Sequence, residues 1–453
     1  MMNMTMNRRQ FMFGAAAMLG ARQMWAGSIG AARLKLGVLS DVHVNTAAQV
    51  PMLEKAFAYF RDHGADGVII AGDMADTGQI GQLDMVGAAW FRVFPDGKAP
   101  DGRKVENLFV YGNHDVSFRG SPIGRDRKAA WERAFKEPWL GGVYAKQIKG
   151  YTFIGAHWGC ENQLDAYLTA NAARLGLNGK KPFFYAQHPH PGGTVQGPWA
   201  WGNDRGVATK ALSRFPNAVA FSGHSHYSHT DERCVWQGAF TSIGTSSLRY
   251  IFAQYARENG ENYGKRTLQM PLLDECAAHQ GMLMTVCDDC LVLERLDFNA
   301  CEKTGPDWIV PLDGSRAFAF EPRRAKAVPP EFPAGAQVAV RRISGKDRAG
   351  RPTEQVEVSV PPAAASATSR VYDYEVRALA PCAREDREEE IAVRRVLSTS
   401  FHLPPVRETT ETQRCVFALA DLGGAKTVRF EVRPGECFGT RGRSIATKAD
   451  FGG

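Results

Sequence analysis

Short apolar runs alternate with segments of helical periodicity between residues 34 and 300. Five of the runs predict buried strands, and they occupy residues 34–43, 66–73, 106–115, 181–188 and 218–226. Residues 48–64 predict a helix with one apolar face that ends at Gly64, because glycine is a common helix terminator. Strands separated by helical stretches predict an α/β fold with a layered sheet. Residues 281–298 instead predict a hairpin with a tight turn at Asp288 and Asp289.

The pattern changes after residue 320. Residues 321–335 are rich in proline and predict a linker. Beyond them come runs such as EQVEVSV, in which Val356, Val358 and Val360 alternate with polar residues. Several such runs predict a small all-β sandwich, of the immunoglobulin or fibronectin type III kind, over residues 336–440. Residues 441–453 are expected to form a loose tail. The chain is therefore divided into a first domain at 33–320 and a second at 336–440.

The first 32 residues resemble an export signal. Arg8 and Arg9 precede an apolar run at 11–21, which is too short to span a bilayer, since about 20 residues are needed. The paired arginines resemble those of a bacterial twin-arginine signal. This predicts recognition by the twin-arginine translocon and a periplasmic or extracellular location. Removal of the segment and its retention as an anchor are both open.

Composition narrows the class of protein only modestly. Of the 453 residues, 44% are hydrophobic and 23% are charged, which is typical of a globular chain. The net charge of +7 is spread along the sequence, so no nucleic-acid binding is inferred. Nine cysteines, an odd number with irregular spacing, argue against a full disulfide framework, and one or two disulfide bridges stay open.

Each of the five predicted strands ends on side chains that can bind a metal ion. In chain order these side chains are Asp41 and His43, then Asp73, then Asn113, His114 and Asp115, then His188, and finally His224 and His226. In open α/β sheets, ligands bind at the carboxyl ends of the strands. We therefore expect the five segments to converge on one edge.

The ordered set D-x-H, GD, GNHD, H and GHxH resembles that of the calcineurin-like metallophosphoesterases. The resemblance covers residues 34–300 and implies a layered β-sandwich core flanked by helices. It also implies two metal sites: one held by Asp41, His43 and His226, and one held by Asn113, His188 and His224, with Asp73 bridging them. His114 is implied to lie beside the leaving group, oriented by Asp115.

The resemblance implies hydrolysis of phosphate mono- or diesters by a hydroxide that bridges two divalent cations. Nitrogen and oxygen ligands without cysteine favour manganese, iron or zinc. Purple acid phosphatases have a tyrosine at the position of Asp76, so a tyrosinate-bound ferric ion is not expected here. The alternative is a non-catalytic secreted binding module that keeps its metal for structure. His114 argues against it, because the family pattern gives this residue no ligand role.

Other residues are weaker candidates for a functional role, because they lie outside the five motifs. His190 could contact substrate near His188, but a solvent-facing position in a loop is the favoured expectation. His157 could line the cleft, and His229 could support a ligand. Trp199 and Trp201 could stack on a nucleoside or sugar, or could pack locally. The C-terminal domain is expected to supply no ligand and to act as a spacer or to contact glycans or the cell envelope, an analogy from fold alone.

Overall fold

The computed structural model describes residues 29–197, 200–251, 268–269, 274–347, 349–366, 369–382, 387–404 and 411–451. Apart from residues 29–32, the predicted export signal lies outside the described residues. The described chain forms two compact units. The first contains the described residues up to 251 together with Glu275–Phe320, and the second contains residues 268–269, Asp274 and the described residues from 321 onwards.

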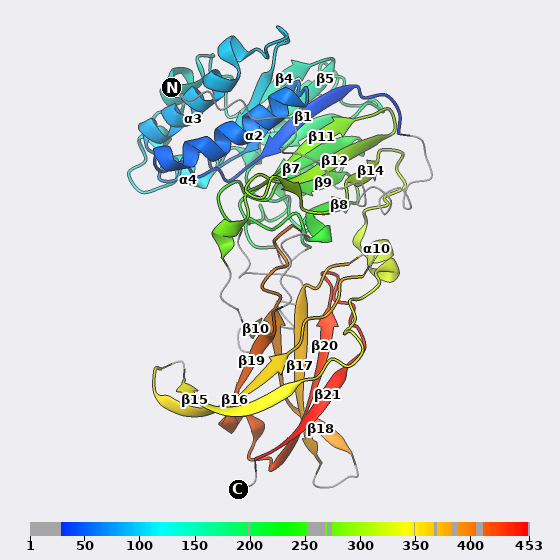
Figure 1. The fold of residues 1–453 in the computed structure, drawn as a ribbon. Coiled ribbons are helices and arrows are strands. Elements are labelled where there is room, and N and C mark those ends of the chain that lie inside the picture. The colour runs from blue at the N-terminus through cyan, green and yellow to red at the C-terminus, as the bar shows by residue number, and fades with distance from the viewer. Residues whose placement is uncertain are drawn as a thin grey trace. The chain divides into compact units, whose positions relative to one another are not determined.

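A seven-stranded sheet forms the first layer of the first unit, in the order β13-β12-β11-β1-β2-β3, with β14 also paired to β12. Figure 1 labels β1, β11, β12 and β14 of this sheet. Its strands are β1 (Leu34–Leu39), β2 (Gly67–Ala71), β3 (Glu106–Val110), β11 (Gln280–Val286), β12 (Cys290–Asp297), β13 (Glu302–Lys303) and β14 (Trp308–Pro311). The pairs β1–β2 and β2–β3 are parallel, so these three strands end on the same edge.

A six-stranded sheet forms the second layer, in the order β4-β5-β6-β7-β9-β8. Its strands are β4 (Val143–Ile148), β5 (Tyr151–Ala156), β6 (Phe183–Ala186), β7 (Ala218–Ser222), β8 (Val235–Gln237) and β9 (Thr241–Gly244). The pairs β5–β6, β6–β7 and β7–β9 are parallel. One apolar core joins the two sheets, because side chains of β1, β2 and β3 pack with those of β6, β7 and β9.

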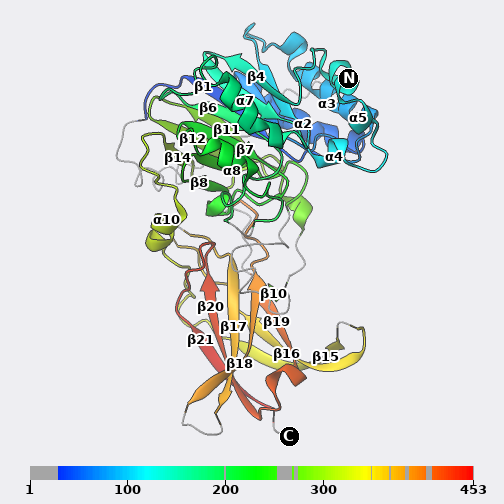
Figure 2. The ribbon, with the colours of Figure 1, turned by 180° about the vertical axis from the view of Figure 1, so that it is seen from behind.

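Helices cover the outer face of each sheet, and two further cores lie beneath them. In the described residues up to 251, the α-helices are α2 (Val50–Asp62), α3 (Ile80–Val93), α4 (Asn113–Val116), α5 (Pro122–Arg125), α6 (Arg127–Phe135), α7 (Leu164–Asn171) and α8 (Val207–Leu212). Helices α2, α3 and α6 pack on the first sheet, and α7 and α8 on the second. Figure 2 labels α7 and α8 in front of the second sheet. Short 3-10 turns lie at Ala47–Gln49, Pro95–Gly97, Glu161–Gln163, Glu232–Cys234 and Glu275–Ala277.

These elements confirm the predicted α/β layers. All five predicted strands are present, and the 281–298 hairpin forms with its turn between β11 and β12. The predicted helix is α2, and its Leu53, Ala56, Phe57 and Phe60 are buried. The core is thus a β-sandwich flanked by helices, as the resemblance implied.

The second unit is an all-β sandwich. One sheet has the order β10-β18-β17-β20-β21 and the other has β15-β16-β19. Its strands are β10 (Leu268–Gln269), β15 (Ala339–Lys346), β16 (Pro352–Val360), β17 (Asp373–Pro381), β18 (Glu388–Leu397), β19 (Gln413–Ala418), β20 (Thr427–Gly435) and β21 (Ile445–Asp450). The alternating valines of β16 face those of β20 across one core. This confirms the predicted C-terminal all-β fold.

Three details of the predicted boundaries are wrong. The first residues of the expected linker form a helix, α10 (Phe320–Lys326), since the proline in it stands in the first turn, where no hydrogen bond is lost. The expected tail contributes β21, which pairs with β20. Within the range assigned to the first domain, β10 pairs instead with β18 of the second unit. Two-residue backbone pairing leaves no periodic pattern from which it could be predicted.

All nine cysteines are free thiols in the structure. Within the described ranges, no helix combines the length and the apolar character that crossing a bilayer demands.

Arginines surround one carboxylate in the five-stranded sheet. Glu375 of β17 lies directly opposite Arg395 of β18 and Arg433 of β20. Arg395 donates a hydrogen bond of 3.2 Å to it, and Arg433 forms an ion pair with it. Burial opposes ionisation, but the charges of Arg441, Arg433 and Arg395 hold the pKa of Glu375 below its usual range.

Because this pKa is lowered by folding, the stabilisation is complete above the unfolded value of about 4.3 and is lost as the pH falls through the folded value. Glu375→Gln should therefore lower the free energy of unfolding of the second unit by roughly 1–3 kcal/mol at pH 7 and much less near pH 3. No tryptophan lies in residues 258–274 or 321–453. Unfolding of the second unit can therefore be identified in calorimetry as the transition that occurs without a change in tryptophan fluorescence. Glu388→Gln, which removes a third-exposed partner of Arg429, is the control. An equal loss in both variants at pH 7 would contradict the prediction.

Candidate metal centre

The predicted ligands converge from two sheets. Asp41 and His43 follow β1, Asp73 follows β2 and Asn113 begins α4 just after β3, whereas the remaining histidines follow strands of the other sheet. His188 follows β6, and His224 and His226 follow β7. The expectation of a single sheet edge is therefore corrected: the carboxyl ends of parallel strands in two packed sheets meet.

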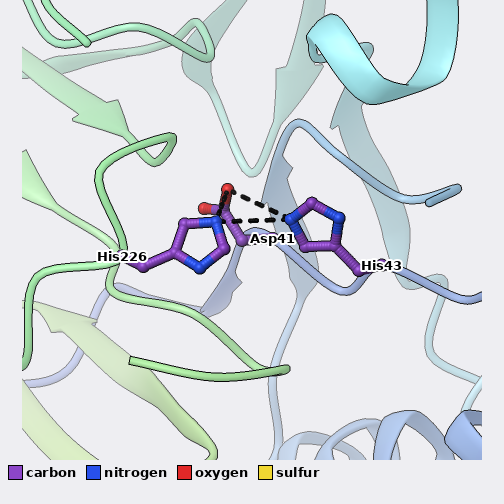
Figure 3. A group of neighbouring side chains, drawn as sticks. All are labelled: Asp41, His43 and His226. Atoms are coloured by element: carbon purple, nitrogen blue, oxygen red, sulfur yellow. Dashed lines mark hydrogen bonds and ion pairs between the residues drawn. The ribbon is translucent and has the colours of Figure 1, made fainter. Parts of the chain in front are cut away.

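The first group of side chains consists of Asp41, His43 and His226 (Figure 3). Nε2 of His226 lies 2.9 Å from Oδ1 of Asp41 and 3.3 Å from Nε2 of His43. All three residues are buried. Two imidazole nitrogens and a carboxylate oxygen thus point at one another from separate elements.

The second group consists of Asp73, His188 and His224. Nε2 of His188 lies 3.0 Å from Oδ2 of Asp73 and 3.1 Å from Nδ1 of His224. The same Asp73 oxygen lies 3.7 Å from Nε2 of His43 in the first group. Asp73 therefore stands between the two groups, where a bridging ligand belongs.

The backbone at the candidate ligands is in a conformation that residues other than glycine rarely adopt. Asp41, His43, Asp73, His224 and His226 all have positive φ, between 45° and 71°. A non-glycine residue in this left-handed region costs of order 1–3 kcal/mol, and such residues cluster at functional sites. Packing of the two sheets holds five of them within one cluster.

Close approach of the backbone also fixes Asp73. A Cβ atom at Gly112 would lie 2.1 Å from Oδ1 of Asp73. That oxygen accepts a hydrogen bond of 2.8 Å from the backbone N–H of His114. Only glycine at position 112 therefore allows the β3 loop to hold this carboxylate.

Buried charges shift the titration of the cluster. Burial opposes ionisation of Asp73, but the charges of His188 and His43 lower the pKa of Asp73 to about 2. Burial likewise opposes the cationic form of His188, yet Asp73 and Asp41 raise the pKa of His188 to about 10. Burial, followed by the charge of His188, lowers the pKa of His224 to about 3. Without a metal, one proton on His188 supplies the positive charge that the two carboxylates require.

The donor set fits divalent cations. Oδ1 of Asn113 is buried and has no hydrogen-bond partner, which is costly unless another group binds it. Within each of the two groups, the candidate ligand atoms lie within 4.8 Å of one another. Carboxylate, amide and imidazole ligands without thiolate suit manganese, iron or zinc. The residues present can therefore hold a two-metal centre.

His114 lies beside this cluster but is oriented differently from the prediction. Its Nδ1 donates a hydrogen bond of 2.7 Å to the backbone carbonyl of Asp76, and its ring centroid is 4.6 Å from that of His43. Asp115 is fully buried and accepts the backbone N–H groups of Ala75, at 2.7 Å, and Gly112, at 2.8 Å. Asp115 thus holds the loop together, and the prediction that it orients His114 is wrong.

Sequence reasoning missed the role of Asp76. Its carboxylate lies 3.1 Å from Nδ1 of His43, which leaves Nε2 of that ring for the cluster. A carboxylate on the far nitrogen of a ligand histidine fixes the ring and its tautomer. In the sequence, position 76 was considered only because it lacks the tyrosine of purple acid phosphatases. A carboxylate three residues after Asp73 could have indicated a partner for a ligand histidine.

His190 is buried, and the expectation that it faces solvent is wrong. Its Nδ1 lies 2.7 Å from Oγ of Ser222, and its Nε2 forms a short hydrogen bond with Oγ of Ser225. Ser225 separates the candidate ligands His224 and His226. His190 therefore clamps the loop that carries both of them.

Of the other candidate side chains, two histidines are buried away from the metal-binding groups and one tryptophan lies against them. His157 is buried, accepts the backbone N–H of Tyr111 at 2.9 Å and stacks on Trp139, so it supports the core. His229 is also buried and contacts the carbonyl of Gly244 at 3.2 Å. Trp201, in contrast, stacks on His224 with ring centroids 4.6 Å apart. Trp199 lies outside the described residues.

Residues 34–228 match the family model described as calcineurin-like phosphoesterase. This part of the chain is therefore similar to calcineurin-like phosphoesterases, in agreement with its five motifs. No curated protein matches the chain.

Several solved structures are similar to it at low identity. A dimetal phosphatase from Danio rerio is 12% identical with a TM-score of 0.40, and the match covers 62% of this chain and 100% of the other. The purple acid phosphatase PPD1 from yellow lupin is 12% identical with a TM-score of 0.41, covering 61% and 53%. GAP50, described as the anchor in the inner membrane complex of Plasmodium, is 11% identical with a TM-score of 0.40, covering 62% and 89%. Function is therefore inferred from the family match and from the residues of the site.

Metal content should separate the role of Asp73 from that of His114. Asp73→Ala should remove or disorder both metals, because this carboxylate faces both groups of ligands. His114→Ala should keep both, because its ring contacts His43 without belonging to the set around Asp73. The measurement is elemental analysis of metal-loaded protein after gel filtration. Equal losses in the two variants would contradict the assignment.

His190, which holds the loop between His224 and His226, should affect metal binding less than a ligand does. His190→Ala should lower metal affinity by roughly 10- to 100-fold, the usual cost of losing a group that orients a ligand. A calorimetric manganese titration measures it. His157→Ala, which removes another buried histidine without touching the 222–226 loop, should change metal affinity little. A matching loss in both variants would mean that general destabilisation is the cause.

Proposed function

We propose that this protein is a metal-dependent phosphoesterase with a dinuclear centre. The observation that carries the proposal is the position of Asp73 between two groups of buried imidazole and carboxylate ligands. Two cations held in this way supply a nucleophile at neutral pH and neutralise charge on a phosphoryl group. The family match over residues 34–228 supports the same reaction class.

The chain's own residues divide the remaining work. Asp41, His43 and His226 would hold one cation, and Asn113, His188 and His224 the other, with Asp73 shared. The hydrogen bond from Nδ1 of His114 to the carbonyl of Asp76 leaves its Nε2 for substrate. His114 is partly exposed, with 31% of its side chain accessible, so an ester oxygen can reach it. It would pass a proton to the departing alkoxide.

A non-catalytic metal-containing binding module is the second candidate. The cluster of ligands is compatible with a purely structural metal, but a structural site is normally closed by its ligands. The exposed His114 beside the ligands, held in one orientation, favours catalysis.

Export through the twin-arginine pathway belongs to the proposal as well. It rests on Arg8 and Arg9 and the short apolar run after them, and it would place the protein in the periplasm or outside the cell. The phosphoester substrate would then be met there. Contact of the second unit with glycans or the cell envelope is proposed from its fold alone.

Turnover of 4-nitrophenyl phosphate and bis(4-nitrophenyl) phosphate by manganese-loaded protein tests the enzyme proposal. We expect hydrolysis of at least one ester, and a roughly 10²- to 10⁴-fold lower kcat in His114→Ala with its metals retained. Asp84→Ala, a surface carboxylate paired with Arg133, is the control. Absence of hydrolysis by protein shown to carry metal would favour the binding module.

A further inference from the structure

Two exposed aromatic side chains flank the metal centre. In the described ranges the exposed large hydrophobic residues are Ile29, Phe118, Leu140, Trp201, Val207 and Val328. Phe118 and Trp201 are the aromatic members of this set, and each contacts a histidine of the site. Scattered exposed apolar residues are ordinary, but two aromatic rings at one catalytic centre call for a ligand.

Phe118 is held beside His114. Its ring is 45% exposed and its centroid lies 5.6 Å from that of His114. The turn that carries it is closed by the backbone N–H of Ser121, which donates to the carbonyl of Phe118 at 2.9 Å. The Ser121 hydroxyl donates to the carbonyl of Asp115 at 2.8 Å, which ties this turn to the ligand loop. The ring is therefore positioned on the side where the leaving group would depart.

Trp201 is held against His224. It is 42% exposed and stacks on that imidazole at an interplanar angle of 21°. A Cβ atom at Gly202 would lie 2.3 Å from Cδ2 of His224, so only glycine allows this approach. The carbonyl of Gly202 accepts a hydrogen bond of 3.0 Å from the backbone N–H of His190. The loop is thus fixed with one part of the indole buried and another open to solvent.

The two rings approach the centre through separate series of contacts. Phe118 follows β3 and reaches Asp73 through His114 and His43, whereas Trp201 follows β6 and reaches it through His224 and His188. A phosphodiester carries two ester groups on one phosphorus atom. Two rings on two sides of a phosphate site match that arrangement, and a monoester would use only one.

We propose that the site selects phosphodiesters whose two ester groups carry aromatic or heteroaromatic rings. The leaving group packs on Phe118 beside His114, and the retained group stacks on the open part of Trp201. The selection rests on the proposed function, because it requires the phosphate to lie at the metal centre. Stacking of a planar ring on an aromatic side chain is tolerant of the ring's identity, so the class is defined by planarity.

Two esters with the same leaving group separate the two rings. Bis(4-nitrophenyl) phosphate and methyl 4-nitrophenyl phosphate differ only in the retained group. Trp201→Ala should lower kcat/KM for the first roughly tenfold, mainly through KM, and leave the second nearly unchanged. Phe118→Ala should lower kcat/KM for both. Val207→Ala, another exposed apolar residue, is the control and should change neither.

A binding measurement keeps this test separate from turnover. Phenylphosphonate and methylphosphonate carry a P–C bond that a phosphoesterase does not cleave, and their affinities for the metal-loaded protein are measured by calorimetry. We expect tighter binding of phenylphosphonate, and a ratio near one in Phe118→Ala/Trp201→Ala with metal content intact. Turnover and binding that are indifferent to the two rings would overturn the inference alone. No hydrolysis of any ester by metal-loaded protein would overturn the proposed function, and with it the inference.

Discussion

The structure depends on two carboxylates, Asp41 and Asp73, that are buried side by side. Like charges removed from water are very unfavourable unless a positive charge compensates them. His188 lies within 3.0 Å of Asp73 and 3.8 Å of Asp41, and the two anions raise its pKa to about 10. A divalent cation meets the same demand with more charge. Metal binding must then displace this proton, so affinity and pH are linked.

The architecture serves this constraint. Candidate ligands from two sheets meet because one apolar core packs the sheets together. Five candidate ligand residues adopt left-handed backbone conformations, which local sequence preferences oppose. The core must therefore hold the loops in place. Side chains that contact the candidate ligands without belonging to either group fix the loops further. Asp76 holds His43, Asp115 holds the β2 and β3 loops, and His190 holds the loop between His224 and His226.

Much of the first unit could be predicted from the sequence because its information is local and ordered. Buried parallel strands appear as apolar runs, and polar side chains directly after them mark the site. The spatial grouping around Asp73 follows from that order together with the family resemblance.

The predictions that were wrong concern features that depend on tertiary contacts. The sequence PHP around His190 resembles an exposed loop, yet two serine hydroxyls far along the chain bury it. The pairing of β10 with β18 joins a two-residue segment to a strand more than a hundred residues away. The GNHD motif also does not show which groups its side chains contact. Asp115 accepts hydrogen bonds from backbone N–H groups, and Nδ1 of His114 donates to the backbone carbonyl of Asp76.

The central claim is that the cluster is built around two cations that share Asp73. Anomalous diffraction from a crystal of the manganese-loaded protein tests it most directly. We expect two peaks, one contacted by Asp41, His43 and His226 and one by Asn113, His188 and His224, with Asp73 contacting both. A single peak, or two peaks without Asp73 between them, would contradict it.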